Sequence, residues 1–128
     1  MREILFRGKR YDNGNWVEGY LIHDETCNTH IPYIGYLFDG GHDIDVAEII
    51  LGTVGQFTGI TDANGTKIFE GDIVECARED EPLKVEWCED TARFILSAST
   101  FCCDFDNYWG YEMEVIGNIH DNKEPLEG

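Results

Sequence analysis

Turn-forming residues interrupt this chain so often that its apolar segments are too short for long helices. Asn-Gly pairs stand at residues 13–14 and 64–65, and a Glu-Gly-Asp step at residues 70–72. Asparagine and glycine tolerate the positive φ that tight hairpin turns require. Between the turns, as in WVEGYLI (16–22), successive residues fall on opposite faces of an extended strand. No segment shows a long apolar period of 3.6 residues flanked by helix caps, so helix content should be low.

The alternating segments predict a mainly β protein built from many short strands. Small barrels and sandwiches have this pattern of short strands and frequent turns. We expect an N-terminal β-rich lobe over residues 1–53, which begins with a hairpin, and a second lobe over residues 54–128. The segment IDVAEIILGTV (44–54) is ambiguous between helix and strand, and its β-branched residues favour strand. The expected strands are 4–11, 16–22, 31–38, 54–60, 67–69, 73–77, 83–89, 92–99 and 114–120.

The glycine-rich stretch GQFTGITDANGTKIFEGDIVE (55–75) raises the question of a ligand-binding loop. A phosphate-binding loop needs G-x-x-x-x-G-K-[ST] before a helix, whereas Lys67 does not directly follow Gly65. A calcium loop needs glycine at its sixth position, where this stretch has Lys67. The stretch is therefore interpreted as two tight turns between strands. Gly65, Gly71 or both should have positive φ.

The net charge of −17 is the most unusual bulk property, with 26 acids against 9 bases. Such a field repels a bare phosphate backbone, so direct nucleic-acid binding is not expected. It favours a partner protein with a basic surface or a basic peptide, although an acidic charge also serves solubility alone.

Because no apolar run approaches the roughly 18 residues of a membrane helix, and the basic start lacks the core of a signal peptide, a cytoplasmic location is expected.

Five irregularly spaced cysteines, Cys27, Cys76, Cys88, Cys102 and Cys103, indicate reduced thiols rather than a secreted disulfide framework. A metal site at Cys27 with His30, or at Cys102 with Cys103, stays open, but the paired spacing of structural zinc is missing. We therefore expect no metal and no cofactor.

Catalytic signals are weak. No G-x-S-x-G elbow is present, and Ser97 and Ser99 lie in a strand-like run. A thiolate from Cys102 or Cys103 with His42 or His120 cannot be assembled from sequence alone. Among 26 carboxylates some close pair will arise by chance, so a small hydrolase is the least favoured class.

Three blocks carry a resemblance to a known family: MREILFRGKRYDNGNWVEGYLIHD (1–24), TVGQFTGITDANGTKIFEGDIVE (53–75) and EVIGNIHDN (114–122). In this order they resemble the YopX family of small bacteriophage and prophage proteins. The resemblance implies a mostly β fold with an SH3-like barrel in the C-terminal part, and it implies no catalytic residue. The segment TFCCDFDNYWGYEME (100–114) is particular to this chain.

Two classes of function follow from these observations. The first is a non-enzymatic phage or prophage accessory protein that acts through protein contacts, with Tyr108, Trp109 and Tyr111 as a candidate aromatic binding surface. Trp87, inside an alternating strand, is assigned more readily to the core. The second is an acidic mimic of DNA that inhibits a host nucleic-acid-binding protein. The sequence leaves the partner and any homo-oligomer open.

Overall fold

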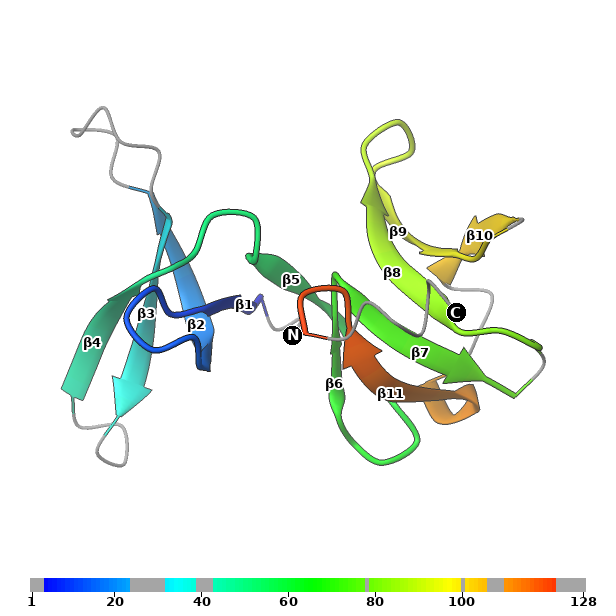
Figure 1. Cartoon of the computed structure of the whole chain (residues 1–128), viewed down its shortest axis with the longest axis horizontal. Helices are drawn as coiled ribbons and strands as arrows, with labels where there is room; N and C mark the ends of the chain where they lie inside the picture. Colours follow the sequence, from blue (N-terminus) through cyan, green and yellow to red (C-terminus); the bar gives the residue numbers. More distant parts are fainter. Residues whose placement is uncertain are drawn as a thin grey trace. The chain divides into compact units, whose positions relative to one another are not determined.

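The computed structural model describes residues 4–23, 32–38, 43–77, 79–99, 101–105 and 110–121 (Figure 1). The chain divides into two compact units, Met1–Phe57 and Thr58–Gly128, four residues after the division expected from the sequence. The fold is mainly β, as predicted. The 3-10 helix η3 (Gly110–Glu112) is a short helical element in the described ranges. No helix in the described part of the chain is long and apolar enough to cross a membrane.

The strands of the first unit are antiparallel to their neighbours in the sheet. They are β1 (Phe6–Lys9), β2 (Trp16–His23), β3 (Pro32–Phe38), β4 (Asp43–Glu48) and the start of β5 (Gly55–Thr61). Together with β6 (Lys67–Phe69) they form a sheet of order β4-β3-β2-β1-β5-β6. The predicted N-terminal hairpin is confirmed, because β1 pairs with β2 around the turn at Gly14, whose φ is 74°.

One face of this sheet carries the core of the first unit. Ile34, Ala47 and Ile49 are buried there, and Phe6, Val17, Tyr36 and Val54 pack against them. Gly8 faces Ile49 so closely that a Cβ atom at position 8 would overlap the Ile49 side chain. The close approach of Ile49 thus explains why residue 8, in the FRGK sequence of β1, is a glycine.

The second unit contains a five-stranded antiparallel sheet of order β10-β9-β8-β7-β11. Its strands are β7 (Asp72–Cys76), β8 (Leu83–Cys88), β9 (Arg93–Ser97), β10 (Cys102–Asp104) and β11 (Met113–Asn118). The core consists of Ile68, Val74, Cys76, Leu83, Val85, Leu96, Phe105 and Met113. Strand β10 lies between residues 99 and 114, where no strand was expected from the sequence.

The predicted SH3-like barrel is not confirmed. In the described residues both sheets are open, and β10 and β11 are the edges of the second one. The alternation of side chains locates strands correctly but does not say which strands pair, so closure was not determined by the pattern.

The two turns are confirmed, since φ is 81° at Gly65 and 93° at Gly71. The assignment of Trp87 to the core is wrong, because Trp87 packs edge-on against Phe94 at the surface and is 42% exposed.

Candidate binding site

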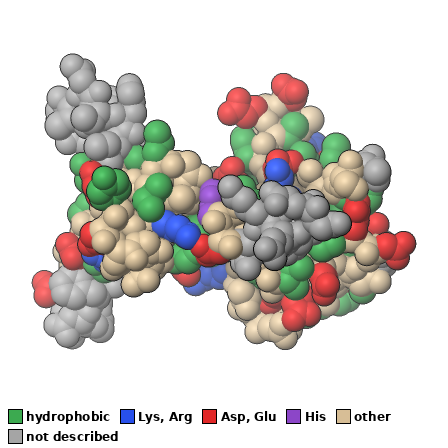
Figure 2. Space-filling view, in the orientation of Figure 1, with side chains coloured by type: hydrophobic (Ala, Val, Ile, Leu, Met, Phe, Trp, Pro, Cys, Tyr) green, Lys and Arg blue, Asp and Glu red, His purple; other side chains and the backbone are tan. Residues whose placement is uncertain are grey.

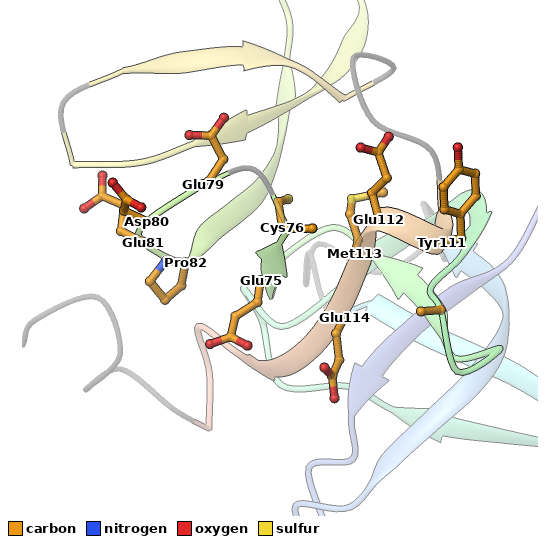
Figure 3. A pocket seen from close by; sticks show the side chains of 12 residues that line it. Glu75, Cys76, Glu79, Asp80, Glu81, Pro82, Tyr111, Glu112, Met113 and Glu114 are labelled. Carbon is orange, nitrogen blue, oxygen red and sulfur yellow. The ribbon is translucent and has the colours of Figure 1, made fainter.

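A pocket of about 430 Å³ opens on the surface of the second unit (Figure 3). Half of the described residues that line it are acidic, and none of these described residues is a lysine or an arginine. We call this site the acidic pocket. Its lining residues are Ala63, Glu75, Cys76, Ala77, Glu79, Asp80, Glu81, Pro82, Tyr111, Glu112, Met113 and Glu114.

Strands β7 and β11 build the base of the acidic pocket. Cys76 faces Met113 across the two strands, and both side chains are buried at 5% and 1% exposure. Just beyond them, the Ala77 N–H donates to the Glu112 carbonyl over 3.1 Å, which keeps the two chain segments together. The Ala63 N–H donates to the Met113 carbonyl over 3.0 Å. The base is therefore fixed by strand pairing and core packing.

The loop between β7 and β8 forms one wall. The Glu79 N–H donates to the Cys76 carbonyl over 3.0 Å, and the Glu81 carboxylate accepts from the Ser99 hydroxyl over 3.0 Å. In Figure 3 the residues Glu79 to Pro82 lie on one side of Cys76, and Tyr111 and Glu112 lie on the other. The wall is thus tied both to β7 and to the end of β9.

Glu75 and Glu114 occupy directly facing positions on β7 and β11, and both are exposed. Like charges at facing positions of an antiparallel pair are destabilising. The ion pairs Lys84–Glu86 and Arg93–Asp104, which the structure describes in this unit, involve no pocket residue. Arg78 belongs to the wall segment but lies outside the described ranges. Glu75 and Glu114 thus occupy facing positions at the pocket, and we expect this arrangement to cost stability.

Of the aromatic residues predicted as a binding surface, Tyr111 lines the acidic pocket and is 74% exposed. Tyr108 and Trp109 lie outside the described residues. The acidic residues of the pocket were missed, because Glu75 and Glu114 look like ordinary outward positions until the pairing of β7 with β11 is known. The charged run at residues 78–82 lies between two expected strands and was not predicted to form a site.

The cysteines give no further site. Cys76, Cys88, Cys102 and Cys103 are free thiols, while Cys27 and His30 lie outside the described residues. Cys102 is exposed and Cys103 is half-buried, because neighbouring residues of β10 point to opposite faces. Within the described ranges no three His, Cys, Asp or Glu side chains are grouped so that they could hold a metal ion.

Two antiparallel sheets of short strands, with an acidic pocket on one unit, define a small all-β protein. The family model for YopX protein matches residues 5–127, so the chain belongs to the YopX family. The solved structure of protein EF1440 from Enterococcus faecalis is similar, with a TM-score of 0.58 and 24% sequence identity over 98% of this chain and 99% of that chain. At this identity the likeness shows a shared fold. The comparison with curated proteins gave no match.

Proposed function

We propose that this protein is a non-enzymatic phage or prophage accessory protein that binds a basic segment of a partner protein in its acidic pocket. The observation that carries the proposal is the pocket itself, with six carboxylates around a buried base and an exposed tyrosine at the rim. A pocket of about 430 Å³ is within the usual size range of binding sites. The charge of Lys and Arg side chains complements its acidic lining.

The distribution of charge along the chain supports this proposal. The first unit has nine acids and four bases, whereas the second has seventeen acids and five bases, so their net charges are −5 and −12. Figure 2 shows Asp and Glu side chains at several places on the surface of the second unit. A field of one sign raises the rate at which an oppositely charged partner arrives. The unit with the pocket is the one that attracts a basic partner most strongly.

Tyr111 gives the pocket a means to select a basic side chain over a simple cation. An ammonium or guanidinium group over an aromatic ring gains about 0.5–1 kcal/mol at an exposed site, in addition to its attraction to carboxylates.

The wider aromatic groove expected with Tyr108 and Trp109, and the SH3-like barrel that would present it, remain predictions. In this proposal the protein acts in the cytoplasm of the bacterial host.

The second candidate is the DNA mimic, which the net charge of −12 on one unit favours. The two candidates differ in what they require of single residues. A mimic depends on the summed charge of a surface, so any two acids contribute alike, whereas a pocket depends on the acids that line it.

Binding of a short Arg- and Lys-rich peptide, measured by calorimetry, tests the proposal. The variant Glu75→Gln/Glu114→Gln should bind about tenfold more weakly, which corresponds to about 1.4 kcal/mol. The control Glu89→Gln/Asp90→Asn removes the same charge from the turn between β8 and β9 and should change affinity less than about twofold. Equal losses in both variants would refute the pocket and support the mimic.

A further inference from the structure

Strand β4 of the first unit has an outer edge that is open in the described part of the chain. It is the last strand in the order β4-β3-β2-β1-β5-β6 and pairs with β3 on one side (Figure 1). An open strand edge presents backbone N–H and C=O groups that can pair with another chain. The outward backbone groups and the side chains of β4 determine which kind of segment can pair with this edge.

The hydrogen bonds identify the backbone groups at this edge. Beyond the end of β4, the Ile49 N–H donates to the Pro32 carbonyl over 3.0 Å, so odd-numbered residues point their backbone groups toward β3. Even-numbered residues point away from it, and the Glu48 carbonyl accepts from the Tyr11 N–H over 2.9 Å. Ile44 and Val46 therefore present their backbone groups to the open part of the edge.

The side chains of β4 differ sharply between its two faces. Ile44 and Val46 are 71% and 50% exposed, and the strand register places them on the same face as Tyr20 and Ile22, which are 65% and 40% exposed. Asp43 and Asp45 project from the other face and are also exposed. An added strand would have apolar neighbours on one face and acidic neighbours on the other.

We propose that β4 binds an extended segment of a partner protein by strand addition. The segment alternates apolar residues with Lys or Arg. Its apolar side chains pack beside Ile44 and Val46, and its basic side chains pair with Asp43 and Asp45. Backbone hydrogen bonds supply affinity in this mode of recognition, and alternate side chains supply specificity. The inference is independent of the acidic pocket, because it concerns the other unit.

Charge complementarity selects this occupant over a second copy of the chain. Pairing of β4 with itself would bring together two sets of Asp43, Asp45 and Glu48, with no base on either strand. Like charges on neighbouring strands oppose such a pair. Acidic edge residues therefore block self-association and leave a basic strand as the favoured addition.

The Asp45 carboxylate covers the edge until such a strand arrives. One oxygen accepts from the Val46 N–H over 2.8 Å, and the other accepts from the Tyr36 hydroxyl over 3.1 Å. The Arg10 guanidinium in turn donates to the Tyr36 oxygen over 2.8 Å. A carbonyl of the incoming strand replaces Asp45 at the Val46 N–H, which releases that carboxylate oxygen for a basic side chain.

The test uses a capped octapeptide that alternates Lys and Val, and measures its binding by fluorescence anisotropy. In Ile44→Pro the outward N–H is lost without breaking the ladder to β3, so affinity should fall at least about tenfold. The control Ile44→Thr keeps the N–H and should bind within about threefold of the parent. Parent-like binding by Ile44→Pro would overturn strand addition.

A second measurement leaves the protein unchanged, in case the proline variant does not fold. Two peptides are N-methylated, one on every Lys and the other on every Val, so that each loses the N–H groups of one strand edge. One of them should lose binding and the other should keep it. Equal binding of the two would contradict the proposal.

The pocket variant Glu75→Gln/Glu114→Gln separates the two sites. It should retain the part of the peptide binding that Ile44→Pro loses, because its strand edge is unchanged. If it loses this peptide while Ile44→Pro retains it, the peptide occupies the acidic pocket, and strand addition is refuted while the pocket stands.

Discussion

At the scale of single residues, the buried Asp62 and the turn residue Gly71 both connect segments of the second unit by hydrogen bonds. Asp62 is 6% exposed, and its carboxylate accepts hydrogen bonds from the N–H groups of Asn64, Thr66 and Val115 at 2.9 Å each. It therefore closes the Asn-Gly turn and joins it to β11. Gly71 donates its N–H to the Val85 carbonyl, and its own carbonyl accepts from the Ile119 N–H.

Asp62→Ala should lower the free energy of unfolding by about 1–3 kcal/mol for each buried N–H that water cannot reach. Burial raises the pKa of Asp62, but the N–H donors of Val115, Thr66 and Asn64 together lower it below 3.8. Because the folded pKa is the lower one, this stabilisation is present above the unfolded pKa and disappears as pH falls through the folded value. Urea unfolding between pH 7 and pH 2 should show the loss in the parent and a flatter profile in Asp62→Asn. Parallel profiles would contradict this role.

Gly71→Val should cost on the order of 1–3 kcal/mol, since φ at this position is 93° and β-branched residues avoid that region. A Cβ atom there would lie 3.5 Å from His120 Nε2, an ordinary contact, so the first carbon of a side chain does not clash. Gly71→Asn is the matched control and should retain more stability, as asparagine tolerates positive φ. Thermal melts measure both variants. An unchanged midpoint for Gly71→Val would mean that the turn is not under this constraint.

At the scale of elements, the sequence predicted the strands well and their partners poorly. WVEGYLI, LKVEWCE and ARFILSAS are strands because their alternation is local, and the turn glycines are recognisable because their φ is local. The pairing of Glu75 with Glu114 joins residues 39 positions apart, and no local pattern encodes it. The acidic pocket depends on that pairing, so its residues could not be found before the sheet was known.

This facing pair gives the prediction at the element scale. Glu114→Lys converts a repulsive cross-strand pair into an attractive one and should raise stability by roughly 0.2–1 kcal/mol. The same change should weaken binding of a basic peptide. Glu86→Lys on β8 is the control, since Glu86 pairs with Lys84 over 2.7 Å and its reversal should destabilise instead. Equilibrium urea unfolding distinguishes the two, and loss of stability in Glu114→Lys would show that the pair is not repulsive.

At the scale of the whole molecule, the two units divide the surface chemistry. The second unit carries most of the negative charge and the acidic pocket, and the first carries an exposed apolar face beside an acidic strand edge. In the two proposals both surfaces bind a basic partner, by side-chain capture in one unit and by strand addition in the other. Because the pocket relies on exposed carboxylates, its affinity for a basic peptide should fall as salt rises and screening shortens the reach of the charges.

The central claim, that the acidic pocket captures basic side chains, is tested most directly by an NMR titration of the labelled protein with a short Arg- and Lys-rich peptide. The account predicts saturable shifts concentrated in the amides of residues 75–81 and 111–114, and their loss in Glu75→Gln/Glu114→Gln. Shifts spread evenly over all acidic surfaces, or none in these two segments, would contradict it.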